Sequence, residues 1–207
     1  MSAPIIAFFN NKGGVGKTSL VFHLSWMYAD LGINVLAADL DPQSNLTAAF
    51  LEDELLEKFW PDGEHSNTIF GSIEPLLRGT GDIVEKPYVE RIDERINLLI
   101  GDLELGRPVK AYERWAKRIP EVYSEEILGK KPKTGGVGSQ NQMGSVRHYR
   151  SLMPMAQEAH KPIFHLRPAD GAIGSLQNAI HDARDNFKQL AVEIARRCKI
   201  DIPNNLN

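Results

Sequence analysis

A mainly parallel α/β fold is predicted by three short apolar strands, by helix-length segments between them, and by a glycine-rich turn after the first strand. The strands are expected at residues 5–9, 35–40 and 96–100. Strands separated by helix-length segments imply right-handed crossovers and a parallel sheet, whose ligands bind at the carboxyl ends of the strands. The glycine-rich turn and the acidic residues after residue 38 lie at that edge.

The elements of the first half follow in chain order from local patterns. A helix is predicted over 17–31, with Gly32 as its stop, because apolar residues recur at helical spacing; they are Leu20, Leu24, Met27 and Leu31. A second helix is expected to begin near Ser44 and to reach past Leu55, before the breaker at 61–63. Residues 66–80 are predicted to form a short helix or turn.

The second half is less regular. Residues 109–128 have a helical pattern that Pro120 interrupts, and residues 129–144 have the composition of a flexible loop. A last short strand is predicted at 162–166. A closing helix is predicted over 173–197, with one apolar stripe made of Ile180, Ala183, Phe187, Leu190 and Ile194.

Length and composition favour one domain over residues 1–207. A chain of 207 residues is long enough to bury a core without disulfides or metals. The single cysteine, Cys198, excludes a disulfide framework within one chain and fits a reducing, cytoplasmic compartment. The N-terminus enters a strand directly, with neither a basic leader nor a long apolar segment, so no membrane span is expected.

The net charge of −3 hides an asymmetry between the halves. Residues 1–106 carry 7 Lys and Arg against 17 Asp and Glu, whereas residues 107–207 carry 17 against 10. A basic half is the pattern of a surface that meets phosphate backbones, although scattered cations are also ordinary solvated residues. We predict non-specific DNA binding by two basic groups, represented by Arg114 and Lys117 and by Arg147 and Arg150.

The glycine-rich turn predicts a phosphate site. The segment Asn11-Lys12-Gly13-Gly14-Val15-Gly16-Lys17-Thr18-Ser19 joins an apolar strand to a helix. Backbone N–H groups of such a turn and the positive end of the helix dipole favour a multiply charged anion. Lys17 is placed to reach terminal phosphates and Thr18 to bind Mg²⁺, as in nucleotide-binding P-loops. We therefore predict that Gly13, Gly14, Val15, Gly16, Lys17, Thr18 and Ser19 hold ATP.

Two motifs together resemble the ParA/MinD/Soj family of partition and positioning ATPases. The first is the deviant loop with its extra Lys12, and the second is Asp39-Leu40-Asp41-Pro42-Gln43-Ser44-Asn45-Leu46-Thr47 at the end of the second strand. The resemblance implies a P-loop NTPase-like three-layer fold. It also implies an ATP-sandwich dimer in which Lys12 reaches the partner's phosphates, and an Asp41 that positions the attacking water.

The same resemblance implies that a segment is missing. The family's buried strand that ends in a magnesium-ordering aspartate is not found, and residues 1–105 and 107–197 resemble the N-terminal and C-terminal parts of larger relatives. Asp39, with Thr18 and Asp41 in the predicted metal site, or Asp102 after the third strand, are candidates to replace that aspartate.

Two functions follow. One is an ATPase that binds DNA and a ParB-like stimulating partner and acts in plasmid or chromosome partition or cargo positioning. The alternative is a hydrolysis-deficient, nucleotide-binding regulatory partner of full-length relatives.

Overall fold

The computed structural model describes residues 3–8, 13–60, 65–106 and 146–203. The predicted helix at 109–128 and loop at 129–144 lie outside these ranges, as do Lys12, Arg114 and Lys117. The side chains of Arg147 and Arg150 are also outside the described part, although their backbone belongs to a helix.

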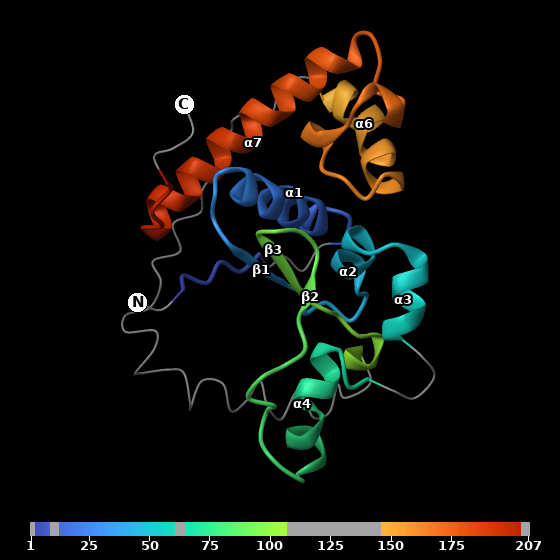
Figure 1. The fold of residues 1–207 in the computed structure, drawn as a ribbon, viewed down its shortest axis with the longest axis vertical. Helices are drawn as coiled ribbons and strands as arrows, with labels where there is room; N and C mark the ends of the chain where they lie inside the picture. The colour runs from blue at the N-terminus through green and yellow to red at the C-terminus, as the bar shows by residue number, and fades with distance from the viewer. Residues whose placement is uncertain (1–2, 9–12, 61–64, 107–145, 204–207) are drawn as a thin grey trace.

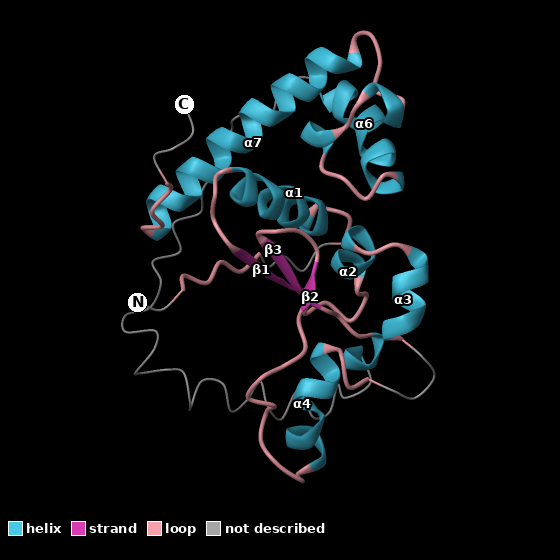
Figure 2. Ribbon diagram, viewed as in Figure 1, coloured by secondary structure: helices cyan, strands magenta, loops and turns pink. Residues whose placement is uncertain are grey.

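Three strands form a small, mainly parallel sheet (Figure 2). Strand β1 (Val35–Ala38) pairs in parallel with β3 (Ile96–Leu99), and Val35 lies opposite Ile96. The short strand β2 (Glu90–Arg91) pairs antiparallel with β3 on its other side, which gives the order β1-β3-β2. The predicted α/β class with a mainly parallel sheet is therefore confirmed.

Helices connect and cover the strands. Between β1 and β3 the chain forms α2 (Asn45–Phe50), α3 (Asp53–Phe59) and α4 (Ile69–Arg78). The predicted single helix after Ser44 is divided in two because Leu51 adopts an extended conformation with φ −113° and ψ 140°. A 3₁₀ turn, η1 (Leu103–Gly106), follows β3.

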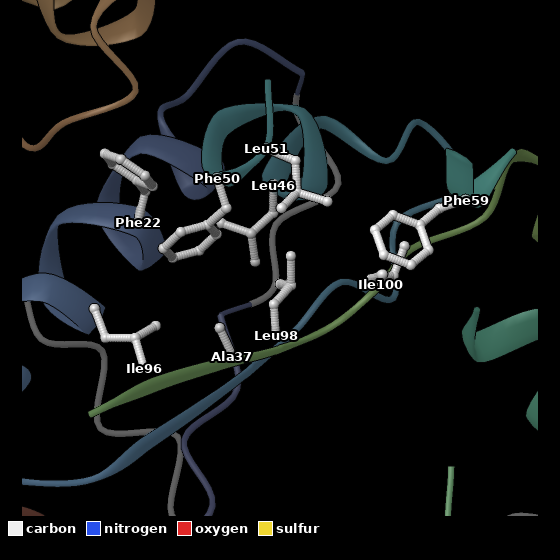
Figure 3. Close-up of a cluster of buried hydrophobic side chains, with 9 residues drawn as sticks. All are labelled: Phe22, Ala37, Leu46, Phe50, Leu51, Phe59, Ile96, Leu98 and Ile100. Atoms are coloured by element: carbon white, nitrogen blue, oxygen red, sulfur yellow. The ribbon is translucent and has the colours of Figure 1, made fainter. Parts of the chain in front are cut away.

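Helix α1 (Lys17–Asp30) lies between the sheet and the C-terminal helix (Figure 1). Its Phe22 packs with residues of the sheet and of α2; this cluster is drawn in Figure 3 and consists of Phe22, Ala37, Leu46, Phe50, Leu51, Phe59, Ile96, Leu98 and Ile100. On another side α1 places Leu24 and Met27 against Phe187 of α7 (Leu176–Cys198). The predicted apolar stripes of both helices are confirmed.

The remaining C-terminal elements pack against α7. They are α6 (Val146–Glu158) and the 3₁₀ turn η2 (Ile163–His165). A second 3₁₀ turn, η3 (Pro168–Asp170), lies between η2 and α7 in the chain and has no buried residue. Gly171 and Gly174 have positive φ angles of 85° and 60° and delay the start of α7 to Leu176. Among the described residues, no helix combines the length and the apolar character needed to cross a membrane.

Two predicted strands are wrong. Residues 3–8 form no strand: β1 and β3 pair directly with each other, and among the described residues nothing pairs with the other edge of β1. Instead Ile6 and Phe8 pack beside the cluster between α1 and α7. Residues 162–166 contain a 3₁₀ turn, because the His165 N–H bonds back to the Pro162 carbonyl at 2.9 Å and Ile163 and Phe164 enter two different apolar clusters.

Candidate nucleotide site at the edge of the sheet

The glycine-rich turn has a backbone conformation that depends on its glycines. Gly14 and Gly16 have φ angles of 68° and 85°, which side-chain-bearing residues rarely adopt. A Cβ atom added at Gly13, Gly14 or Gly16 would meet no described residue within 4 Å, so the described part of the chain leaves space around the turn. The described part of the loop thus combines a left-handed backbone with room for an anion.

Helix α1 begins at the end of this turn. Gly16 is its N-cap, and the first helical hydrogen bond runs from the Leu20 N–H to the Gly16 carbonyl at 2.9 Å. The first turn contains no acidic side chain that would compete with an anion for the helix dipole. Lys17 and Thr18, predicted to bind phosphates and Mg²⁺, occupy the first two helical positions and are partly buried.

A second group of polar residues follows β1. Asp39 is only 3% exposed, and its Oδ2 accepts hydrogen bonds from the Thr47 N–H at 2.8 Å and from the Thr47 hydroxyl at 2.9 Å. Its Oδ1 accepts from the Asp41 N–H at 3.3 Å. Burial raises the pKa of Asp39, although the hydrogen bonds from Thr47 oppose that shift. The carboxylate of Asp39 is therefore directed into the protein.

Asp41 lies at the surface of the same turn. Its Oδ1 accepts a hydrogen bond from the Gln43 N–H at 3.0 Å, and its carbonyl accepts from the Ser44 N–H at 2.9 Å. Ser44 is buried with φ 49°, and its hydroxyl has no hydrogen-bond partner among the described residues. Asp41 thus presents its side chain to solvent from a turn that is fixed by backbone contacts.

Asp102, the other candidate carboxylate, follows β3 and is also buried. Its Oδ2 accepts from His65 Nδ1 at 2.8 Å and from the Thr68 hydroxyl at 2.5 Å, and its Oδ1 accepts from the Glu104 N–H at 2.7 Å. Both of its oxygens are therefore occupied by protein donors. Among the described residues, no three His, Cys, Asp or Glu side chains come together as a metal site.

The first turn of α1 is connected to the C-terminal helices. The Ser19 hydroxyl lies 3.4 Å from the sulfur of Met153 in α6, and the Ser19 carbonyl accepts a hydrogen bond from His23 at 2.6 Å. The ring of His23 stacks on Phe187, with centroids 4.8 Å apart. Because burial lowers the pKa of His23 to about 4, the ring is neutral at pH 7 and Nδ1 is the donor.

Residues with a structural role here drew no assignment from the sequence. Thr47 belongs to the quoted motif, yet only its buried hydroxyl, between two strand ends, shows what it does. The pairing of His65 with Asp102 joins residues 37 positions apart and has no sequence signal. The predicted DNA-binding residues Arg114, Lys117, Arg147 and Arg150 are not tested by the described geometry.

Comparisons with known proteins agree with the loop and the Asp-Pro-Gln turn. A family model described as an AAA domain (AAA_31) matches residues 3–104. The chromosome-partitioning ATPase Soj of Thermus thermophilus is 54% identical over 43 residues, which are 21% of this chain and 17% of that protein. Residues 3–104 belong to the ParA/MinD/Soj family of partition ATPases.

One relative matches a longer part of the chain than residues 3–104. The uncharacterized protein MJECL24 of Methanocaldococcus jannaschii is 30% identical over 144 residues, covering 63% of this chain and 51% of the relative. The chain therefore matches about half the length of that relative. The crystal structure of protein DIP2308 from Corynebacterium diphtheriae is 30% identical and aligns with a TM-score of 0.47 over 54% of this chain and 41% of that one.

Proposed function

We propose that this protein binds Mg-ATP in the glycine-rich turn and works as a ParA-like ATPase. Residues 13–19 hold the phosphates, Thr18 binds the magnesium ion, and Asp41 positions the attacking water. The observation that carries this proposal is the open turn itself, with its two left-handed glycines directly before Lys17. Asp39 is predicted from the sequence to share the metal site, but both of its oxygens accept hydrogen bonds from the protein. In this proposal Asp39 therefore supports Asp41 and does not bind the metal.

The proposed cycle includes a second copy of the chain, DNA and a stimulating partner. ATP closes a sandwich dimer in which Lys12 reaches the other copy's phosphates, and the dimer binds DNA without sequence preference. A ParB-like partner stimulates hydrolysis and release. Relatives named as chromosome-partitioning and plasmid-partitioning proteins support a role in partition or in the positioning of another cargo.

A second candidate is a nucleotide-binding regulator without useful turnover. It is favoured by one observation: the two buried carboxylates at the strand ends, Asp39 and Asp102, have both oxygens occupied by protein donors. Such a protein would pair with full-length relatives through the same loop. Turnover separates the two candidates.

The first experiment measures binding of a fluorescent ATP analogue with Mg²⁺ and follows phosphate release in the same samples. Lys17→Ala removes the phosphate-binding cation, and Lys188→Ala removes an exposed lysine of α7 as a matched control. Binding that needs Lys17 but not Lys188, with slow phosphate release, supports the ATPase. Lys17-dependent binding without release supports the regulator, and no binding contradicts both.

The DNA proposal is tested through salt dependence. Each phosphate contact that is lost should reduce the slope of log affinity against log salt by about 0.9. We expect the double variant Arg147→Ala/Arg150→Ala to flatten the slope by about 2. Arg78→Ala/Arg91→Ala removes the same charge from the acidic half and should leave the slope unchanged. An unchanged slope in the first pair would mean that Arg147 and Arg150 do not meet DNA.

A further inference from the structure

Thr47 lies between the ends of the two parallel strands. It is fully buried, in the first turn of α2, and its hydroxyl has two partners. The hydroxyl donates to Asp39 Oδ2, after β1, at 2.9 Å, and accepts from the Gly101 N–H, after β3, at 2.8 Å. One side chain therefore links both strand ends at the edge where the candidate site lies.

The link continues from Thr47 to Asp41. Asp39 is held on one oxygen by the N–H and hydroxyl of Thr47, and its other oxygen accepts from the Asp41 N–H at 3.3 Å. Asp41 then fixes its own turn through the N–H groups of Gln43 and Ser44. A continuous path of hydrogen bonds thus runs from β3 to the residue proposed to position water.

The packing leaves little freedom in this arrangement. A Cβ atom on Gly101 would lie 2.9 Å from Asp39 Cγ and 2.9 Å from Ser44 Oγ, so only glycine fits there. A charged, buried carboxylate is stable only when its hydrogen bonds are made. Removal of the Thr47 hydroxyl would leave both the Asp39 carboxylate and the Gly101 N–H short of a partner.

We propose that Thr47 is a positioning residue that fixes Asp41 against β3 through the buried carboxylate of Asp39. This inference rests on the proposed function in its consequence for hydrolysis, because Asp41 is the water-positioning group there. It assigns Asp39 to the support of Asp41. Neither Thr47 nor Asp39 contacts the nucleotide in this proposal.

The test compares Thr47→Val, which keeps the shape but loses the hydroxyl, with Thr47→Ser, which keeps the hydroxyl. Tyr28→Phe is the matched control, because it removes another buried hydroxyl hydrogen bond, to the Ala191 carbonyl at 3.1 Å, far along α1. The readouts are amide hydrogen exchange at Asp41 and Ser44, affinity for the ATP analogue, and kcat at saturating ATP.

We expect Thr47→Val to speed exchange at both amides by about tenfold or more and to lower kcat about tenfold, with affinity within about threefold of the unmodified chain. Thr47→Ser restores both readouts, and Tyr28→Phe changes neither. Unchanged exchange in Thr47→Val, absence of rescue by serine, or faster exchange with unchanged kcat would each overturn the proposal.

Failure of the proposed function remains distinguishable. Exchange at Asp41 and Ser44 needs no nucleotide, so it decides the positioning role even when the unmodified chain lacks Lys17-dependent binding or turnover. If Thr47→Val does not fold, Asp39→Asn takes its place, because one carboxylate oxygen becomes an N–H₂ donor and one side of the link is lost. Unchanged exchange in that variant would equally overturn the proposal.

Discussion

Two buried carboxylates follow the two parallel strands, and each belongs to a different hydrogen-bond network. Asp39, after β1, and Asp102, after β3, each accept a hydrogen bond from the hydroxyl of a threonine at the start of a helix. The Asp39 network, through Thr47, reaches Asp41 in the candidate site. The Asp102 network joins Thr68 and, by a direct hydrogen bond, His65, whose side chain is 22% exposed.

The comparison shows that the same pair, a threonine hydroxyl bonded to a buried aspartate, has two different roles at one edge of the sheet. Thr68 is the N-cap of α4, and the Ile69 N–H bonds to the Ile100 carbonyl at 2.8 Å, so the Asp102 network attaches α4 to β3. The Asp39 network attaches the turn that carries Asp41. We therefore expect damage to the Asp102 network to lower stability, and damage to the Asp39 network to lower both stability and activity.

The largest effect is expected from Gly71→Ala in the Asp102 network. A Cβ atom at Gly71 would lie 2.0 Å from the His65 carbonyl oxygen, so the turn before α4 must move. We expect a loss of about 3 kcal/mol or more in the free energy of unfolding, measured in urea. Gly81→Ala, whose Cβ would lie 3.5 Å from Pro75, is the control and should change stability by less than about 0.5 kcal/mol. Equal losses in the two variants would contradict a role of this close approach in stability.

Acid sensitivity is expected from a third buried group, His23, and must be separated from both networks. Burial lowers its pKa from 6.5 to about 4, so its contribution to stability is complete above pH 6.5 and is lost as the pH falls toward 4. The shift corresponds to a loss of about 3 kcal/mol in the free energy of unfolding. The contribution of Asp39 to stability changes with pH in the opposite direction, because a raised pKa makes the folded state more stable as Asp39 becomes protonated.

The measurement is urea unfolding between pH 7 and pH 4. His23→Leu should remove most of the dependence on pH in this window, although the variant also loses the hydrogen bond to the Ser19 carbonyl. His181→Gln changes an exposed histidine of α7 and should keep the original profile. A profile in His23→Leu as steep as in the unmodified chain would assign the acid sensitivity to other groups.

A smaller effect is expected from Thr68→Val. The variant removes one donor to Asp102 and the N-cap of α4, and we expect a loss of about 1–2 kcal/mol in the free energy of unfolding. Because this network does not reach Asp41, affinity for the ATP analogue should stay within about twofold of the unmodified chain. A loss of nucleotide affinity at unchanged stability would instead connect Asp102 to the nucleotide.

The sequence predicted what depends on local pattern and on motif. Helices α1 and α7 follow from apolar periodicity, β3 from an apolar run, and the family from the glycine-rich loop and the Asp-Pro-Gln turn. The strand predicted at 5–9 shows the limit, because residues 5–8 leave the free edge of β1 unpaired, and Ile6 and Phe8 pack beside the cluster between α1 and α7 instead. Likewise, the inward direction of Asp39 depends on Thr47 and Gly101, and the second of these is distant in sequence.

The smallest effect is expected at Gly101, which follows β3 and donates a hydrogen bond into the Asp39 network. Its N–H donates to Thr47, and its carbonyl accepts from the Trp60 indole N–H at 3.1 Å. Trp60→Phe removes that donor and should lower the free energy of unfolding by about 1 kcal/mol.

Trp26→Phe is the matched control, because the buried indole N–H of Trp26 has no partner among the described residues. Removal of an unsatisfied buried donor should offset part of the lost packing, so Trp26→Phe should be the milder change in urea unfolding. Hydrogen exchange at the Asp41 amide should respond to Trp60→Phe but not to Trp26→Phe, because Trp60 bonds to Gly101, the residue that joins β3 to Thr47. A response to both variants would mean that general loosening of the sheet, and not this connection, governs the turn.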